Sequence, residues 1–248
     1  MAGNDRVRCV WKNQAGGLTF ELSNGARRRF LKWAPIGSGI EIEAEVARLV
    51  WAIQFTPVPR YLDSGQDHTG RWLLTEPVPG QSAVSEHWKR EPRVAVIAIG
   101  QGLRRLHDAL PVDQCPFNWS APIRVSHARR RAALGQIDPA EWHREHRDLT
   151  IDQALDMVSS VPPMDRAVVA HGDACAPNTM LRANGRWSGH VDLGAMGVAD
   201  RWADLAVATW STVWNYGRNW EQELLAAYGV DPDRVRTDYY RLLWDLGP

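Results

Sequence analysis

The stretch His171-Gly172-Asp173-Ala174-Cys175-Ala176-Pro177-Asn178 decides how this chain is interpreted. An apolar run from Ala167 to Ala170 precedes it and predicts a buried strand, and two more short strands are expected around the turn at Asn184-Gly185. Asp192-Leu193-Gly194 follows the last of these strands. We therefore expect a polar loop between buried strands, with a second carboxylate in the next loop.

The order of the polar residues in this stretch is typical of phosphoryl transfer. Protein kinases place a catalytic base and two magnesium ligands by a carboxylate, an amide a few residues later, and a second carboxylate just after a strand. Asp173, Asn178 and Asp192 have this order. Each has another explanation on its own, because Asp and Asn are common turn residues and an Asp can cap a strand end. Together they favour the catalytic interpretation.

Two rival chemistries use the same loop. The spacing His171-x-Asp173-x-Cys175 can suggest a transition-metal cluster, and Cys175 paired with a histidine can suggest a nucleophile. The first lacks a distant fourth ligand, and the second lacks an oxyanion or nucleophile-elbow pattern. Both are disfavoured.

The chain resembles the aminoglycoside phosphotransferases, which are relatives of the protein kinases. The motifs that carry the resemblance are His171-Gly172-Asp173, Pro177-Asn178, Asp192-Leu193-Gly194, Gly197-Val198-Ala199-Asp200-Arg201 and Asp204. The resemblance extends from about Trp11 to the C-terminus. Asp113-Gln114-Cys115-Pro116-Phe117 is similar to the branch that modifies the 3′ or 3″ hydroxyl.

The resemblance implies a role for each polar residue of the motifs. Asp173 would be the base that accepts the proton of a substrate hydroxyl as it attacks the γ-phosphoryl group of ATP. Asn178 and Asp192 would hold Mg²⁺, a hard ion that takes oxygen ligands. His171 and Asp204 would be structural, and Asp204 is placed early in a helix, where it can receive backbone N–H groups of the catalytic loop.

Composition excludes several other classes of function. The chain has 248 residues, with 29 Lys plus Arg and 29 Asp plus Glu, so no global field points to nucleic acid or a membrane surface. No apolar run has the length of a membrane span. The 3 scattered cysteines form neither a zinc spacing nor a disulfide framework. We expect a cytoplasmic protein, monomeric or weakly dimeric, whose partner is a small-molecule acceptor.

Residues 7 to 33 predict three strands. The turn that contains Gly16 and Gly17 can lay backbone N–H groups over phosphates, although an ordinary hairpin loop explains the bare motif better. Lys32 ends the third strand; alone it indicates a snorkelling surface lysine, and in a kinase-like lobe it would hold the nucleotide phosphates. Glu43 and Glu45 flank the apolar stripe of the next helix, 40 to 55. Periodicity does not choose between them, and the resemblance selects Glu45.

Glu76-Pro77-Val78-Pro79-Gly80 indicates a linker, because proline cannot donate to a strand ladder. In the resemblance this linker is the hinge between lobes, where the Glu76 C=O and the Val78 N–H would meet the adenine edge. We expect a nucleotide-binding lobe over residues 1–78 and a catalytic and acceptor-binding lobe over 79–248.

The expected fold class is α+β. We predict a bilobal, protein-kinase-like architecture: a small lobe with a five-stranded antiparallel sheet plus one helix, and a mainly helical large lobe. Further helices are expected at 92–110, 121–136, 150–159, 201–216, 220–228 and 233–246. On the first of these, Val94, Ile97, Leu103, Leu106 and Leu110 form the predicted inner face.

The acceptor site carries the weakest signal. By resemblance, Glu141, Glu145 and Asp245 are the candidate carboxylates for a polycationic acceptor. The family pattern is not kept nearby: His143 and Arg144 stand where the family is more acidic, Trp244 replaces an acidic residue, Ala195 occupies a position that is often arginine, and the chain ends Gly247-Pro248 rather than in an aromatic pair.

The expected activity is ATP- and Mg²⁺-dependent phosphorylation of an aminoglycoside-type antibiotic at a 3′ or 3″ hydroxyl, with resistance as the outcome. The departures from the family pattern leave room for a less cationic acceptor such as streptomycin. Two alternatives remain: a kinase of another small molecule, such as a peptide antibiotic or a metabolite, and a nucleotide-binding pseudokinase module without turnover.

Overall fold

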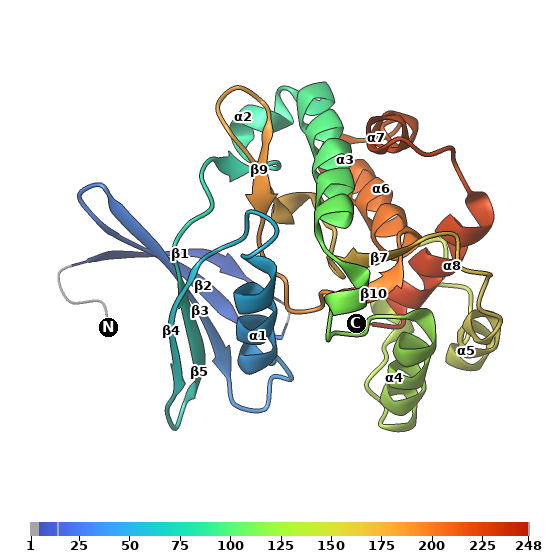
Figure 1. The fold of residues 1–248 in the computed structure, drawn as a ribbon. Helices are drawn as coiled ribbons and strands as arrows, with labels where there is room; N and C mark the ends of the chain where they lie inside the picture. The colour runs from blue at the N-terminus through green and yellow to red at the C-terminus, as the bar shows by residue number, and fades with distance from the viewer. Residues whose placement is uncertain (1–4, 14, 248) are drawn as a thin grey trace.

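The computed structural model describes residues 5–13 and 15–247 and has two lobes (Figure 1). The N-terminal lobe is an antiparallel sheet with strand order β1-β2-β3-β5-β4 and one helix, α1. Its elements are β1 (Arg6–Lys12), β2 (Leu18–Asn24), β3 (Arg27–Pro35), α1 (Ile42–Ala52), β4 (Tyr61–Gln66) and β5 (Gly70–Thr75). The predicted five-stranded sheet with one helix is confirmed.

Strand β3 lies at the centre of this sheet and carries Lys32. In the register of the sheet Lys32 is opposite Thr19 of β2 and Leu73 of β5. A central strand cannot slip by one residue without exchanging its two faces, so the pairing on both sides fixes which way the Lys32 side chain points. The hairpin at Ser23-Asn24-Gly25 joins β2 to β3, and Gly25 has a φ of 58°.

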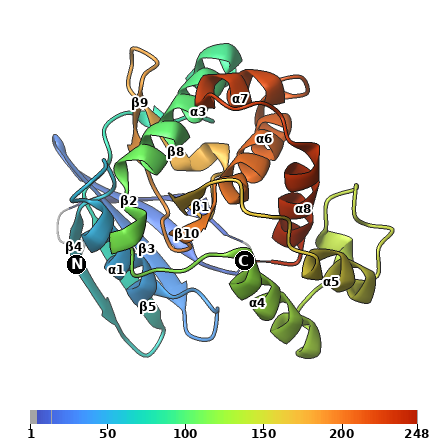
Figure 2. The same ribbon diagram turned by 45° about the vertical axis from the view of Figure 1, so that its right-hand side comes forward.

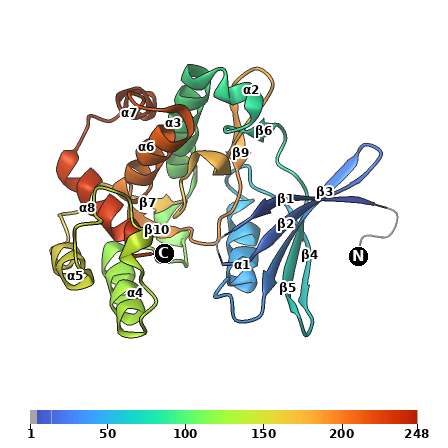
Figure 3. The same cartoon turned by 180° about the vertical axis from the view of Figure 1, so that it is seen from behind.

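Helix α1 packs against the sheet (Figure 3), and its buried face differs from the expected stripe. Val50 and Ile53 were expected to be buried, and they are 49% and 43% exposed. The buried positions of the helix are Ile42, Glu45, Leu49 and Ala52. The buried face is rotated relative to the predicted one because the Glu45 carboxylate is held inside by an ion pair with Lys32 of the sheet. The periodicity of apolar residues cannot predict such a contact.

The C-terminal lobe is mainly helical. Its helices are α2 (Glu86–Lys89), α3 (Pro92–Ala109), α4 (Ala121–Ala133), α5 (Ile151–Ser159), α6 (Trp202–Tyr216), α7 (Glu221–Tyr228) and α8 (Arg234–Asp245), with short 3₁₀ turns at Val112–Gln114, Pro139–Glu141 and Ala176–Asn178. Helix α3 packs against α7, α6 packs against α8, and α4 and α5 lie side by side next to α8 (Figure 2). Among the described residues, no helix combines the length and apolar character needed to cross a membrane.

Two small antiparallel ladders flank residues 171–178, which we call the catalytic loop after their predicted role. Strand β7 (Ala167–Ala170) pairs with β10 (Gly197–Asp200), and β8 (Thr179–Leu181) pairs with β9 (Trp187–His190). Strand β6 (Gln81–Ser82), directly after the inter-lobe linker, pairs with β8. The loop between β7 and β8 is therefore fixed at both ends, which positions its polar residues.

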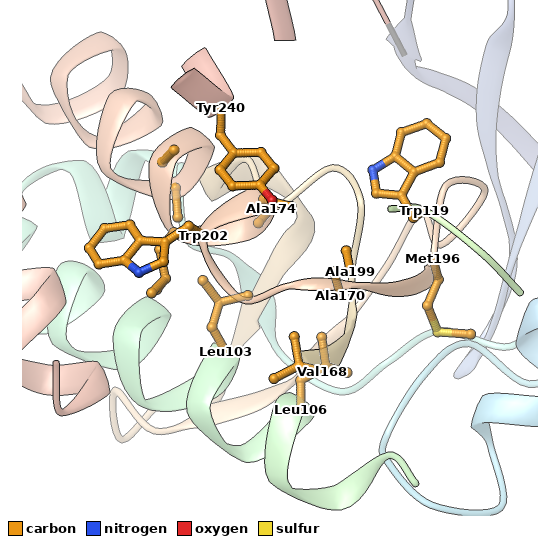
Figure 4. Close-up of a cluster of buried hydrophobic side chains, with 14 of the residues drawn as sticks. Leu103, Leu106, Trp119, Val168, Ala170, Ala174, Met196, Ala199, Trp202 and Tyr240 are labelled. Atoms are coloured by element: carbon orange, nitrogen blue, oxygen red, sulfur yellow. The ribbon is translucent and has the colours of Figure 1, made fainter. Parts of the chain in front are cut away.

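A hydrophobic core lies beneath this loop (Figure 4). Leu103 and Leu106 of α3 pack with Val168 of β7 and Ala199 of β10, and all four are at most 1% exposed. The predicted inner face of α3 was partly wrong, because Val94 is 38% exposed. Helix α3 is covered on two sides, by α7 and by β9, so its buried surface is wider than one apolar stripe. Val94 lies outside this buried surface.

Candidate active site

Helix α6 holds the start of the catalytic loop through one carboxylate. Asp204 accepts hydrogen bonds from the backbone N–H groups of His171 (2.6 Å) and Gly172 (2.9 Å), as expected for this residue from the sequence. Burial opposes ionisation of Asp204, but the hydrogen bond from His107 Nε2 (2.9 Å), together with the backbone N–H groups, lowers its pKa. A charged, fully buried anchor therefore lies directly under the loop.

The ring of His171 connects this loop to the loop of Asp192. Its Nε2–H donates to the Val191 carbonyl (3.0 Å), and its Nδ1 accepts from the Asp173 N–H (3.2 Å). A carbonyl only accepts and an amide N–H only donates, so these partners define a neutral imidazole with its proton on Nε2. The two loops that carry the predicted catalytic and metal-binding carboxylates are thus joined through one side chain.

Gly172 lets the loop approach its neighbour closely. Its φ is 86°, and a Cβ at this position would lie 2.2 Å from the Ala195 carbonyl oxygen. Any other residue would be strained and would push the Asp-Leu-Gly loop away. The glycine of the His-Gly-Asp motif is therefore required by packing.

A second anchor from α6 was not foreseen from the sequence. The Ala176 N–H donates to Ser211 Oγ (2.8 Å), and Asn215 Nδ2 donates to the same oxygen (3.1 Å). Ser211 is fully buried and lies on the same helix as Asp204. A signal was present in the sequence, because Asp204 and Ser211 are polar and lie seven positions apart, which places them on one face of the predicted helix.

Asp173 projects between the two anchors. Its Oδ2 accepts from Asn178 Nδ2 (3.0 Å), which also donates to the Asp173 backbone carbonyl (3.0 Å). Its Oδ1 is buried and has no hydrogen-bond partner among the described residues. Burial, and next the negative charge of Asp192, raise the pKa of Asp173. An unpaired acceptor oxygen at a carboxyl of raised pKa is suited to receive a proton.

Lys32 forms an ionic link between the lobes. Its ammonium donates to Glu45 Oε2 (2.7 Å) and to Asp192 Oδ1 (2.5 Å). Burial raises the pKa of Glu45 despite the nearby ammonium. Burial opposes ionisation of Asp192 as well, but there the Lys32 charge prevails and lowers the pKa. Burial disfavours the charged form of Lys32, but its two carboxylate neighbours outweigh this effect and hold its pKa above the usual value. The resemblance selected Glu45 over Glu43, and Glu45 is the residue that contacts Lys32.

These side chains line one cleft of about 1010 Å³. The predicted residues on its walls are Lys32, Glu45, Glu76, Val78, Asp173, Asn178 and Asp192. A second hollow, of about 620 Å³, lies around Arg201 and Asp231 and contains none of the predicted site residues. The first cleft is therefore the candidate active site, because it unites the motifs that the sequence singled out.

The inter-lobe linker lines this cleft, whereas the two glycines of the turn after β1 do not. Glu76 N–H donates to the Arg60 carbonyl (2.9 Å), which fixes the linker to the N-terminal lobe. Asn13 lines the cleft, whereas Gly16 and Gly17 are not among its lining residues. The Asn13 N–H donates to the Gly17 carbonyl (3.0 Å), and Gly17 N–H donates to Asn13 Oδ1 (2.6 Å), so this turn closes on itself as a hairpin loop.

The oxygen ligands in the cleft fit a magnesium–nucleotide complex better than a protein-only metal site. The described residues contain no group of three His, Cys, Asp or Glu side chains that could hold an ion. Asn178 turns its Nδ2 towards Asp173, which leaves its Oδ1 as an acceptor, and Asp192 offers its second oxygen. Mg²⁺ commonly takes one or two protein oxygens and completes its shell with phosphates and water.

The rival chemistries find no support here. Burial, and next the neighbouring Asp173 charge, raise the pKa of the Cys175 thiol well above its usual value. A thiol that resists ionisation is a poor nucleophile near neutral pH. Cys175 therefore belongs to the wall of the cleft rather than to the reacting groups.

The three carboxylates expected at the acceptor site do not line the cleft. Asp245 accepts from His146 Nδ1 (2.6 Å) and from the His143 N–H (3.1 Å), and its side chain is 9% exposed. Glu145 is exposed, with 3.8 Å between its Oε2 and His143 Nδ1, and Glu141 is exposed in a 3₁₀ turn. The residues that α6 and α8 contribute to the cleft are instead Ser211, Trp214, Asn215 and Trp244.

A strand-borne lysine paired with a helix glutamate, opposite an Asp…Asn…Asp set on loops of a helical lobe, defines a kinase-like phosphotransferase. The family model of the phosphotransferase enzyme family matches residues 12–239, and the chain belongs to this family.

Sequence relatives agree with this assignment. The aminoglycoside 3′-phosphotransferase of Streptomyces fradiae is 34% identical over 251 residues, covering 94% of this chain and 92% of the relative. The streptomycin 3″-kinase of Streptomyces griseus is 32% identical over 248 residues, covering 93% and 88%.

Solved structures agree as well. The aminoglycoside-3′-phosphotransferase of type VIII superposes with a TM-score of 0.85 at 31% identity, covering 98% of this chain and 93% of that one. The aminoglycoside phosphotransferase APH(3″)-Id of Streptomyces rimosus, in complex with ADP and streptomycin, has a TM-score of 0.77 at 31% identity, covering 97% and 92%. The predicted family and fold class are confirmed.

Proposed function

We propose that this enzyme transfers the γ-phosphoryl group of ATP to a 3′ or 3″ hydroxyl of an aminoglycoside-type antibiotic and thereby confers resistance. The observation that carries the proposal is Asp173 Oδ1, a buried acceptor without a partner among the described residues, on the wall of the cleft that also holds Lys32 and Asp192. Relatives of about one-third identity that act on aminoglycosides and on streptomycin support the acceptor class.

The N-terminal lobe, which we place at residues 1–78, would bind the nucleotide. Lys32, held by Glu45, would neutralise phosphate charge, and the Glu76 carbonyl and Val78 N–H would meet the adenine edge. Gly16 and Gly17 would reach the phosphates through backbone N–H groups only if their hairpin turn moves onto the nucleotide. The other assignments are supported by the position of Lys32, Glu45, Glu76 and Val78 on the wall of the cleft.

The C-terminal lobe, residues 79–248, would bind the acceptor and carry the chemistry. Asp173 would orient the acceptor hydroxyl and take its proton as the oxygen attacks the phosphorus atom in line with the leaving group. Asn178 and Asp192 would hold Mg²⁺, which supplies charge neutralisation on the phosphates when bound. The ATP requirement fits a cytoplasmic enzyme, and we propose that it acts as a monomer or weak dimer.

The test is Asp173→Asn, which keeps the size of the side chain and removes its basicity. We expect phosphate transfer to an aminoglycoside panel to fall roughly 10²-fold or more, while nucleotide binding measured by titration calorimetry remains. Bacteria that carry the wild-type gene should survive higher drug concentrations than bacteria that carry the variant. Full activity of Asp173→Asn would refute the base assignment, and no turnover of any panel member by wild type would refute the function.

Less cationic acceptors should be tested in the same panel. Among the described residues on the α6 and α8 side of the cleft, Asp173 is the one carboxylate. A kinase of a less cationic small molecule would use the same nucleotide chemistry. Including neutral and singly charged hydroxyl compounds beside the multi-amine drugs separates the two.

A further inference from the structure

The acceptor half of the cleft is aromatic rather than acidic. We define it by the lining residues that α6, α8 and the catalytic loop contribute: Asp173, Cys175, Pro177, Asn178, Ser211, Trp214, Asn215 and Trp244. Asp173 is the one carboxylate in this set of described residues, and the other carboxylates of the cleft lie on the N-terminal lobe, in the inter-lobe linker or at Asp192. An acceptor can therefore gain little here from ammonium–carboxylate pairs.

The last helix explains why Asp245 does not supply such a pair. Consecutive helix residues project about 100° apart, so Trp244 faces the cleft while Asp245 faces the segment 143–146. Asp245 is held there by the His146 ring and the His143 backbone N–H. Its hydrogen-bonding capacity is directed into the protein, away from the space below Asp173.

Trp214 is an exposed indole on a rigid support. It is 46% exposed and lies on the wall of the cleft. Beneath it Trp210 is buried, with the two ring centroids 5.4 Å apart. The His143 ring lies 4.4 Å from Trp210 and 6.4 Å from Trp214, and burial lowers the pKa of His143, which keeps this ring uncharged near neutral pH. The supporting rings reduce the freedom that Trp214 would lose on binding a ligand.

A large exposed indole on the wall of the cleft that also contains Asp173 is a recognition surface rather than a core residue. Indole faces bind the C–H face of a sugar ring by apolar contact and a planar cation by the cation–π interaction. Asn215, whose Nδ2 is engaged by the Ser211 carbonyl (2.8 Å) and hydroxyl, retains its Oδ1 as an acceptor for a ligand hydroxyl. These are the contacts that a weakly cationic glycoside can use.

We propose that Trp214 and Trp244 determine acceptor specificity in this enzyme, by packing on the ring face of a weakly cationic glycoside, and that the acceptor's ammonium groups contribute little to its recognition. This inference rests on the proposed phosphotransferase function and names the acceptor class at the same site. It replaces Glu141, Glu145 and Asp245 as the residues that select the acceptor.

The experiment compares Trp214→Ala and Trp214→Phe with Glu141→Gln/Glu145→Gln in steady-state assays on a panel graded by amine number. Trp214→Ala should raise KM for the acceptor roughly tenfold without changing KM for ATP, and Trp214→Phe should restore most of the loss. The double glutamine variant should behave as wild type. KM for the preferred acceptor should change little between low and high salt, since screening weakens exposed charge pairs and not ring packing.

Three results would overturn the inference: an unchanged acceptor KM in Trp214→Ala, a raised acceptor KM in the double glutamine variant, or a preference that rises with amine number and vanishes in salt. Because Trp214 is exposed, its variants should fold, which circular dichroism checks. Trp244→Ala tests the second position and should also raise KM for the acceptor, with Trp244→Phe as its conservative control. Absence of turnover on the whole panel by wild type would instead refute the proposed function, so the two failures are distinguishable.

Discussion

Asp204 and Ser211 lie seven positions apart on α6 and hold the catalytic loop on either side of Asp173. This spacing is about two helical turns, so both side chains share one face of the helix. Asp204 fixes the backbone before Asp173 at His171 and Gly172, and Ser211 fixes it after Asp173 at Ala176. Helix α6 therefore sets the position of the candidate base through backbone contacts, without a direct bond to its carboxyl group.

Replacing Ser211 by Ala should remove the hydrogen bond that holds the loop after Asp173. The Ala176 N–H would lose its partner in a buried site, at a cost of about 1–3 kcal/mol in the free energy of unfolding. Because Asp173 would be less well oriented, we expect kcat to fall about tenfold while KM for ATP stays near the wild-type value. Urea denaturation and steady-state kinetics measure the two effects.

Thr212→Val provides the matched control on the same helix. The Thr212 hydroxyl donates to the Thr209 carbonyl within α6 and, among the described residues, forms no hydrogen bond with the loop 171–178. Its removal should change stability and leave kcat as in wild type. An equal fall of kcat in both variants would show that α6 acts through general packing rather than through the Ser211 anchor.

Lys32 should be required for nucleotide chemistry. Replacing Lys32 by Met removes the charge that links Glu45 and Asp192, and we expect kcat/KM for ATP to fall roughly 10²-fold. Lys32→Arg should not restore activity, because a planar guanidinium does not fit where an ammonium meets two carboxylates at 2.7 Å and 2.5 Å. Glu43→Gln, at an exposed position of α1, is the control that should keep full activity. An active Lys32→Met enzyme would contradict the assigned phosphate contact.

The sequence predicted the nucleotide side of the site better than the acceptor side for a physical reason. Asp173, Asn178 and Asp192 are recognisable because phosphoryl transfer demands these residue types in this order on short loops. Glu45 could not be separated from Glu43 by periodicity, because its burial depends on an ion pair with Lys32 on another element. The family resemblance was needed to resolve it.

The acceptor side is formed by contacts between distant parts of the chain. Asp245 accepts a hydrogen bond from His146, 99 positions away. The His143 ring meets the rings of Trp210 and Trp214 only after α6 packs beside the segment 143–146. No local pattern in the sequence encodes such contacts. The departures from the family pattern at His143 and Trp244 were visible in the sequence. Their shared consequence, an acceptor half of the cleft lined by indole rings, could be recognised only from the folded structure.

Asp192→Asn should weaken magnesium binding without disrupting the interface between the lobes. The Lys32–Glu45 pair remains in this variant, so nucleotide binding should persist. We expect the Mg²⁺ concentration for half-maximal activity to rise roughly tenfold or more, because a carboxylate ligand becomes a neutral amide. Wild-type activity should vanish when EDTA removes the ion and return on addition of Mg²⁺. The exposed Asp63→Asn variant serves as control; an unchanged Mg²⁺ requirement in Asp192→Asn would contradict the assignment.

His190 should make the fold sensitive to mild acid. It is 1% exposed, and neither ring nitrogen has a hydrogen-bond partner among the described residues. Burial, which disfavours the charged imidazolium, lowers its pKa well below the usual value. The folded state therefore keeps His190 neutral as the pH falls below about 6.5, where the unfolded chain takes up a proton. Since the unfolded state then binds more protons, the free energy of unfolding should decrease as the pH falls, by up to about 1.4 kcal/mol per pH unit from this group.

His190→Leu should remove this contribution, because leucine fills the same apolar surroundings and does not titrate. Urea denaturation at pH 7.5, 6.5 and 5.5 compares the two proteins (chosen to span about one unit either side of the usual histidine pKa). The variant should show the shallower loss of stability towards pH 5.5, and His68→Gln, at an exposed turn, should follow wild type. If His190→Leu and wild type lose stability in parallel, the acid sensitivity arises elsewhere and His190 is protonated at no cost in the fold.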